Sequence, residues 1–533
     1  MMQVPKIKTN HITFSLVFTF LLFTINNLVN IGKLAKWFMA DGSVNLVPFG
    51  SFLIIGLSLF NVIFFLVAHK YTTKALAMIL VFLSGLATYF IAKYNVAIDR
   101  SMLMNVLNTD YTESTALLSV HMFPYILFLI LLPILLITRI EINYQKPTTH
   151  LFNSAKAIVL SLILAVSLAY LNFNAISQAV NISDKYTVHT LVPINVIRSS
   201  LSVVWYGIAP KFKTKMKDID FSAQVTEQKD LIVVLAVGET TRQKNVSLYG
   251  YDRKNTTPLL AQVANLQVLN GIASEGSTLY ALPKILKKNG INLTAVTAKA
   301  GIESSCFVNF TLYGNCDPVQ EVKVSQCGHE GNCYDEDVIP LLESNLSTYS
   351  SGSRFIVLHL GGGSHGPRYR DRYPPEFNVF QPICMDADVI NQCSEEELYN
   401  SYDNSVLYLD YVLNSVLNKL EQSKLPYVMI YLSDHGESLG EEGRVFHGMP
   451  PGIALPPEQA EIPLLVKSSL PIQIEARAQY TQSDVFDSVL HLFSIESPHF
   501  QENHGFIQLA PQVKNLAQEG EADTPPTGAE TAQ

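Results

Sequence analysis

The sequence lacks cysteine throughout its N-terminal half, and it lacks a basic stripe anywhere along its 533 residues. No cysteine precedes Cys306, which excludes disulfides and thiolate metal sites from the earlier part of the chain. Lysine and arginine total 37 against 46 acidic residues, for a formal net charge of -9. Because nucleic-acid binding requires clustered positive charge, we expect no nucleic acid among the partners.

Charged residues are scarce in the first third, where the hydrophobic residues concentrate. Five apolar stretches there have roughly the length needed to cross a hydrocarbon core: Ile12 to Ile31, Leu46 to Ala68, Ala75 to Ala92, His121 to Thr138 and Ala157 to Phe173. A cleaved signal peptide does not explain the first stretch, since four more follow and no small-residue cleavage site is evident. We therefore expect a transmembrane domain over residues 1–173.

Basic residues predict the orientation of this domain. With the N-terminus in the cytosol, the inner flanks hold Lys6, Lys8, Lys70, Lys74, Arg139, Lys146 and Lys156, and the outer flanks hold Lys33, Lys36, Lys93 and Arg100. This bias has the sign of the positive-inside rule. Five crossings would then place the chain after about residue 175 outside the cytosol.

The cysteines test that placement independently. All six lie in the proposed exported part: Cys306, Cys316, Cys327, Cys333, Cys384 and Cys393. An even, clustered set is typical of an oxidising compartment. Sequential pairing is the simplest of the fifteen possible connectivities. A structural zinc site built from these cysteines is the competing interpretation.

In the exported part, polar residues follow apolar runs that read as strands. Leu231 to Val237 precedes Glu239, Phe355 to Leu360 precedes His365, and Val428 to Leu432 precedes Asp434 and His435. Another strand is predicted at Ile291 to Thr297, and helical spacing begins near Tyr402. This alternation predicts a doubly wound α/β domain with a mostly parallel central sheet, over residues 229–515.

A helix is predicted to open at Ser277 or Thr278 and to end at Gly290, although Pro283 lies inside it. A hydroxyl at that position is an N-cap or a nucleophile assisted by the helix N-terminus. Carboxyl ends of parallel strands face one crevice, so these side chains and His447 should converge there. Oxygen and nitrogen donors suit zinc or manganese better than copper. Each residue alone could equally be a cap or turn residue.

Three further segments complete the organisation. Residues 94–113 form a polar loop at the outer membrane boundary, where Asn105, Asn108, Asp110 and Glu113 are head-group ligands or simple helix caps. Residues 174–228 read as a bridging segment of short helices on the membrane face. Residues 516–533, rich in Glu, Ala, Pro, Gly and Thr, read as a disordered tail.

Several motifs resemble the membrane-anchored phosphoethanolamine transferases that modify lipid A, the polymyxin-resistance type, within the alkaline phosphatase and sulfatase superfamily. The matching stretches are Val237 to Arg242, Ser247 to Tyr251, the Ala- and Ser-rich turn that leads to Ser277 and Thr278 before Pro283, Gly363 to Tyr369, Tyr402 to Asn404, Ser433 to Glu441, His447 to Pro450 and the loop Met102 to Glu113. The resemblance covers nearly the whole chain. It implies a five-helix anchor and a sulfatase-like α/β domain in the periplasm, attached to a bacterial inner membrane.

The resemblance also implies roles for individual residues. Thr278 would carry the phosphoethanolamine, with Glu239, Asp434 and His435 as its zinc partners. His365 and His447 would lie near the transferred phosphate, and Asn105 with Glu113 would contact the head group. Phosphatidylethanolamine would be the donor, a lipid A phosphate the acceptor, and the enzyme a monomer.

The chain departs from the family beside the proposed nucleophile, where Ser274, Glu275 and Gly276 precede Thr278 and Lys284 with Ile285 follow Pro283. Glu303 stands where the resemblance suggests a lysine. Two alternatives therefore stay open. One is transfer of phosphoethanolamine or phosphoglycerol to another envelope glycan or core sugar, and the other is a non-catalytic sensor built on a decayed site.

Overall fold

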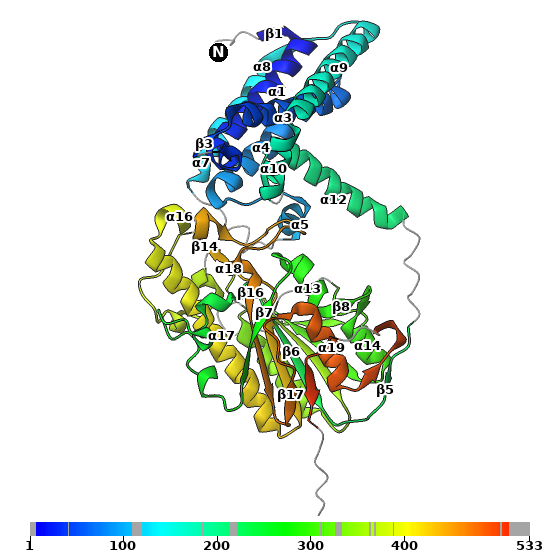
Figure 1. Ribbon diagram of the computed structural model, residues 1–533, viewed down its shortest axis with the longest axis vertical. Helices are drawn as coiled ribbons and strands as arrows, with labels where there is room; N and C mark the ends of the chain where they lie inside the picture. The colour runs from blue at the N-terminus through cyan, green and yellow to red at the C-terminus, as the bar shows by residue number, and fades with distance from the viewer. Residues whose placement is uncertain are drawn as a thin grey trace, which may run out of the picture.

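The N-terminal third of the chain folds into a bundle of long apolar helices (Figure 1). The computed structural model describes residues 7–40, 42–108, 120–183, 186–212, 221–309, 312, 314–325, 333–361, 364–366, 369–386, 389–500 and 504–510. Within these ranges five helical spans could cross a membrane: α1 (His11–Leu28), α3 (Leu46–Val67), α4 (Thr73–Tyr94), the continuous span Met122–Arg139 and α9 (Pro147–Leu171). The fourth span comprises α7 (Met122–Tyr125), the π-helix η2 (Ile126–Leu131) and α8 (Leu132–Arg139). The five predicted crossings are confirmed.

Local polar contacts close the ends of the bundle. The Asn10 side chain caps α1 by accepting the Thr13 N–H at 2.8 Å. Strand β1 (Ile7–Asn10) pairs in parallel with β4 (Ile140–Asn143) at the same end. Toward the other end, Lys33 Nζ donates to the carbonyls of Ile91 and Ala92 at 2.9 and 3.0 Å. A cation there complements the carbonyls at the end of α4, where the Ile91 carbonyl also accepts the N–H of the C-cap residue Asn95 at 3.1 Å.

Shorter elements connect the bundle to the second half of the chain. They are α2 (Ile31–Ala35), η1 (Lys36–Phe38), β2 (Met39–Ala40), β3 (Ser43–Val44), α5 (Arg100–Asn108), α10 (Phe173–Ile182), α11 (Tyr186–His189) and α12 (Ile194–Phe212). The loop predicted over residues 94–113 was partly wrong, because α5 occupies its centre. The Asp99 carboxylate starts this helix by accepting the Met102 N–H at 2.9 Å. The tail expected at 516–533 lies outside the described residues.

An eight-stranded sheet forms the centre of the C-terminal domain. Its order is β11 (Glu321–Lys323), β10 (Glu303–Val308), β12 (Arg354–Leu360), β6 (Ile232–Gly238), β13 (Tyr427–Ser433), β16 (Glu461–Ser468), β7 (Gln267–Ile272) and β18 (Tyr480–Thr481). The first five strands run parallel, and β16 is antiparallel to both of its neighbours. The expected mostly parallel sheet is confirmed, with one antiparallel strand inside it.

Helices cover both faces of the sheet, which is why its central strands are apolar at every position rather than at alternate ones. Leu231, Val233 and Leu235 face one core, which includes residues of α13 (Thr278–Leu286), α14 (Leu293–Lys299) and α19 (Gln482–Leu492). Ile232 and Val234 face the other, with α15 (Ile339–Ser347) and α17 (Glu395–Ser423). Figure 1 shows α17 and α19 on opposite sides of the strands.

Two local predictions were wrong near the proposed nucleophile. Helix α13 ends at Leu286, before the expected Gly290, and β8 (Lys287–Lys288) pairs with β9 (Ile291–Asn292). Of the strand predicted at 291–297, only Ile291 and Asn292 lie in a strand, β9, and the residues from Leu293 onward form helix α14. Leu293, Val296 and Thr297 are buried there at helical spacing and form one face of the helix. The β-branched residues in this run favour a strand, which is why the sequence predicted one.

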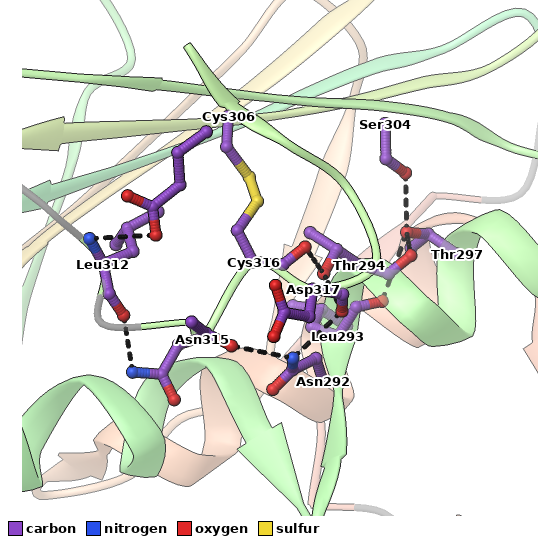
Figure 2. Close-up of a disulfide and its surroundings, with 12 residues drawn as sticks. Asn292, Leu293, Thr294, Thr297, Ser304, Cys306, Leu312, Asn315, Cys316 and Asp317 are labelled. Atoms are coloured by element: carbon purple, nitrogen blue, oxygen red, sulfur yellow. Dashed lines mark hydrogen bonds between the residues drawn. A yellow bond between two sulfur atoms is a disulfide. The ribbon is translucent and has the colours of Figure 1, made fainter. Parts of the chain in front are cut away.

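The structure contains two of the expected sequential disulfides, Cys306–Cys316 and Cys384–Cys393. Cys333 is also disulfide-bonded, and Cys327 lies outside the described residues. Figure 2 shows how hydrogen bonds fix the loop around Cys316. The Thr294 hydroxyl donates to the Cys316 carbonyl at 2.8 Å, and the Asn292 amide donates to the Asp317 carbonyl at 2.9 Å. The first disulfide therefore ties β10 to the start of α14.

Short elements complete the domain. They are the strand pairs β5 (Gln224–Val225) with β19 (Ile495–Glu496), β14 (Ser438–Leu439) with β15 (Val445–Phe446) and β17 (Ile472–Ile474) with β20 (Ile507–Leu509), and the helices α16 (Val389–Gln392) and α18 (Pro457–Ala460). The β14–β15 hairpin contacts the membrane helices, since the Phe446 ring lies 5.0 Å from that of Tyr94 in α4. The end of the sheet that lies beside this hairpin therefore faces the membrane.

Candidate active site

Two neighbouring strands bring Glu239 and Asp434 together. In the β6–β13 register Gly238 pairs with Ser433, so the next residue on each strand is a carboxylate. Asp434 Oδ1 accepts the backbone N–H groups of Thr240 at 3.1 Å and of His435 at 2.8 Å. Thr240 adopts a φ of 52°, which is strained for a β-branched residue and turns its N–H toward Asp434. Both carboxylates are buried.

Thr278 reaches the same place from a different element. It is the first residue of α13, with Ser277 at the N-cap position, and β7 leads into this turn from the same sheet. Its Oγ1 lies 3.0 Å from both carboxylate oxygens of Glu239 and 3.4 Å from His435 Nε2. The helix N-terminus beside this oxygen favours negative charge on it and on any phosphate attached to it.

The donor atoms around Thr278 fit a divalent cation. His435 Nδ1 lies 3.0 Å from the Gly436 carbonyl oxygen, an acceptor, so Nδ1 carries the proton and Nε2 offers its lone pair. That Nε2 lies 3.3 Å from Asp434 Oδ2 and 3.6 Å from Glu239 Oε1, so acceptors face one another without a proton between them. Asp434 Oδ2 is buried and has no hydrogen-bond partner among the described residues. Such an arrangement is costly unless a cation lies between the acceptors.

The spacing of these atoms indicates which cation fits. Tetrahedral zinc with ligand bonds of about 2.0–2.1 Å holds its ligand atoms about 3.3 Å apart. Four of the six separations among atoms of Thr278, Glu239, Asp434 and His435, namely Thr278–Glu239 and the three that involve His435, run from 3.0 to 3.6 Å. Burial lowers the pKa of His435 to about 4, against the opposing effect of Asp434, so the imidazole is neutral at neutral pH and can act as a ligand.

Two more histidines stand beside this cluster. The His447 ring centroid lies 4.4 Å from that of His435 and 4.9 Å from that of His365. A ligand atom of His447 lies within 4.8 Å of ligand atoms of Glu239 and His435, so these three could also hold a metal ion. Burial, with Arg372 and His447 nearby, holds the pKa of His365 well below its usual range. The neutral His365 imidazole and the neighbouring His447 are close enough to the cluster to contact a phosphate bound there.

Glu437 is a residue to which the sequence analysis assigned no role. It is fully buried two residues after His435, and its Oε2 accepts a hydrogen bond from His447 Nδ1 at 3.2 Å. Its Oε1 accepts from the Tyr369 hydroxyl at 3.1 Å. The carboxylate therefore fixes the tautomer and ring orientation of His447, as carboxylate partners of metal-binding histidines do.

Glu437→Gln should consequently lower catalytic activity. The amide would keep the size of the side chain but remove the charge that holds His447, for an expected loss of about 10- to 100-fold in kcat/KM. Tyr369→Phe is the matched variant, since it removes only the other partner of Glu437 and should cost less. The measurement compares the catalytic activity of the purified full-length variants with that of the unaltered protein. Thermal unfolding establishes that each variant is folded. Equal activity of Glu437→Gln and the unaltered protein would refute the positioning role.

The Tyr402–Asp403–Asn404 motif supports the site from α17. The Tyr402 hydroxyl donates to the Thr240 carbonyl at 2.8 Å and accepts the Arg242 N–H at 2.9 Å. The Asp403 carboxylate accepts from the Asn245 amide at 2.6 Å. These buried bonds hold the loop that carries Glu239, and the motif touches none of the proposed metal ligands directly.

The remaining residues that the sequence singled out are not placed at the Thr278 cluster by the described structure. Asn105 lies in α5, although its side chain is not described, and Glu113 lies outside the described residues. Glu275 forms an ion pair with Lys284 at 3.5 Å across the start of α13. Glu303 begins β10 and forms an ion pair with Arg354 at the amino ends of the parallel strands. Glu239 follows the carboxyl end of β6, so Glu303 cannot take the place of a phosphate-facing lysine.

Known proteins resemble this chain over most of its length. Two protein-family models match: Phosphoethanolamine transferase EptA/EptB over residues 57–206 and Sulfatase over residues 270–495. The chain is 31% identical to phosphoethanolamine transferase EptA of Escherichia coli K12, over 89% of this chain and 92% of that protein. It is 27% identical to phosphatidylethanolamine transferase Mcr-1 of Escherichia coli, over 87% and 90%.

A solved structure has the same architecture. The integral membrane protein lipooligosaccharide phosphoethanolamine transferase A (EptA) of Neisseria meningitidis superimposes with a TM-score of 0.81 at 26% identity, covering 92% of this chain and 96% of that one. The likeness includes the helix bundle as well as the α/β domain. The chain therefore belongs to the phosphoethanolamine transferases of the EptA and Mcr type, integral membrane enzymes of the sulfatase and alkaline phosphatase superfamily.

Proposed function

We propose that this enzyme transfers phosphoethanolamine from phosphatidylethanolamine to a phosphate of lipid A, on the periplasmic side of a bacterial inner membrane. The observation that carries the proposal is the Thr278 hydroxyl, at a helix N-terminus and 3.0 Å from Glu239. The names of the EptA and Mcr relatives support the transferred group and the donor. The name of the Neisseria enzyme supports a lipooligosaccharide acceptor.

The reaction would proceed in two displacements at Thr278. First, Thr278 Oγ1 forms a bond to the donor phosphorus, and the bond from phosphorus to the diacylglycerol oxygen breaks. Glu239 is placed to receive the hydroxyl proton, which then passes to the departing diacylglycerol oxygen, while His365 and His447 would contact the phosphate. Then an oxygen of the acceptor phosphate displaces Thr278 from phosphorus, and the proton that this acceptor loses returns to Thr278 through Glu239.

Zinc is the metal that we propose for this site, held by Glu239, Thr278, Asp434 and His435. When bound, it would lower the pKa of the threonine hydroxyl and offset charge that develops on the phosphoryl group. His447 would either join the ligand set or contact the phosphate. Asn105 and Glu113 stay proposed head-group contacts, because α5 lies between the bundle and the α/β domain in Figure 1.

Mass spectrometry of lipid A tests the acceptor and the transferred group together. Lipid A from cells that express the protein should gain the mass of one phosphoethanolamine, which cells with Thr278→Ala should lack. An unchanged lipid A together with a modified core sugar would refute lipid A as the acceptor. This alternative has a precedent in name, since a relative at 25% identity is named Kdo(2)-lipid A phosphoethanolamine 7''-transferase. A gain of phosphoglycerol would refute the transferred group.

A further inference from the structure

Helix α12 (Ile194–Phe212) lies crosswise to the membrane helices. Figure 1 shows it leaving the base of the bundle and running at a wide angle to α9, above the α/β domain. Transmembrane helices lie near the bilayer normal, so a helix across them lies along the membrane surface. It follows α10 and α11 at the bundle end where α4 and α9 finish.

One face of α12 is packed against protein. Asn195, Val196 and Ser199 are buried, and the Ser199 hydroxyl donates to the Ile98 carbonyl at 3.2 Å. This face contacts α5, which Figure 1 places on the side of the α/β domain. The opposite face of α12 therefore turns toward the side of the bundle.

That opposite face is apolar and uncovered. Leu201, Val204 and Trp205 are 63%, 54% and 70% exposed, and Arg198 is exposed one turn before Leu201. Residues 198, 201 and 205 share one side of a helix because they stand at i, i+3 and i+7. An apolar stripe with tryptophan and a flanking cation is the composition of helices that lie in the interface between head groups and acyl chains.

We infer that α12 is an interfacial helix that binds the surface of the phospholipid bilayer in the leaflet where α4 and α9 end. Leu201, Val204 and Trp205 insert among the upper acyl chains, and Arg198 contacts lipid phosphates. The bilayer fits better than a protein partner, because α9, whose last residue Leu171 is exposed like Phe173 after it, ends at the same end of the bundle, and α10 and α11 connect it to α12. Trp205 is also of the residue type that is enriched at membrane interfaces.

The helix would then set the height of the active site above the lipid surface. α12 packs on α5, and the Arg100 guanidinium of α5 lies 5.7 Å from the Tyr280 ring centroid in α13. Tyr280 is two residues after Thr278, in the first turn of α13. This consequence rests on the proposed function, whereas the membrane contact of α12 does not.

Tryptophan fluorescence tests the contact without reference to activity. The chain has two tryptophans, so Trp37→Phe leaves Trp205 as the reporter in the full-length protein. The protein is reconstituted into nanodiscs of phosphatidylcholine whose acyl chains are brominated near the head-group end. Trp205 should then lose most of its fluorescence emission. Bromines near the terminal methyl should quench it less. Unquenched, water-like emission from Trp205 in both lipids would overturn the inference.

Charge introduction gives an independent test. Leu201→Glu in the Trp37→Phe background should reduce the quenching of Trp205 and lower transfer from bilayer phosphatidylethanolamine several-fold. Val379→Glu is the matched control, because Val379 is 59% exposed on the α/β domain and should change neither readout. Unchanged quenching in Leu201→Glu would count against the insertion of this face. Absence of transfer by the unaltered protein would instead count against the proposed function, while the quenching would still report on α12.

Discussion

Thr278→Ala should abolish phosphoethanolamine transfer, with a loss of about 10⁴-fold or more, as expected when a covalent nucleophile is removed. The alanine variant keeps the helix start, since the Thr278 backbone rather than its side chain begins α13. It removes the oxygen that lies 3.0 Å from Glu239 and 3.4 Å from His435 Nε2.

Thr278→Ser is the matched control for this prediction. It retains the hydroxyl and should retain measurable transfer, although the lost methyl group loosens the rotamer. Purified full-length protein incubated with phosphatidylethanolamine should also gain the mass of phosphoethanolamine on the peptide that contains Thr278. A folded Thr278→Ala protein that still modifies lipid A at the normal rate would eliminate the covalent mechanism.

Loss of the metal should have the second-largest effect. Asp434→Asn and Glu239→Gln each remove a negative charge from the buried cluster, and we expect about a 10³-fold loss of transfer. The physical reason is that Asp434 Oδ2 and His435 Nε2 lie 3.3 Å apart with lone pairs facing each other. Without a cation, that proximity is repulsive, and Thr278 has no charge beside it to stabilise its oxyanion.

Elemental analysis separates metal loss from misfolding. The unaltered protein should contain zinc, lose activity on dialysis against a chelator and regain it when zinc is returned. Both cluster variants should bind less zinc, whereas Glu376→Gln, which removes an exposed carboxylate, should behave like the unaltered protein. Full transfer by protein that contains no metal would contradict this account of the site.

The proposed site could be anticipated because its residues follow recognisable apolar strands. Ile232–Gly238 and Tyr427–Ser433 are buried at every position. A polar residue directly after such a strand therefore lies at the carboxyl end of the sheet. The five membrane spans were equally predictable, since crossing a bilayer demands long apolar runs. Motifs also pointed to Thr278, although periodicity alone left it indistinguishable from a helix cap.

Other features depend on contacts between distant segments. From Leu293 onward, the strand expected at 291–297 is a helix because Leu293 and Val296 are buried against β10 and its neighbours, which local β-propensity does not reveal. The role of Glu437 depends on His447 and Tyr369 meeting it, 10 and 68 positions away along the chain. Spacing in the sequence gives no measure of such encounters.

By itself, the sequence determined the membrane spans, the mostly parallel α/β domain and the residues gathered at its strand ends, because hydrophobic burial leaves a periodic trace along the chain. Only the tertiary structure decided which atoms lie close enough to share the proposed cation and which face of α12 stays uncovered. Both depend on side chains brought together from separate elements, where distances of a few tenths of an ångström decide between a ligand and a neighbour.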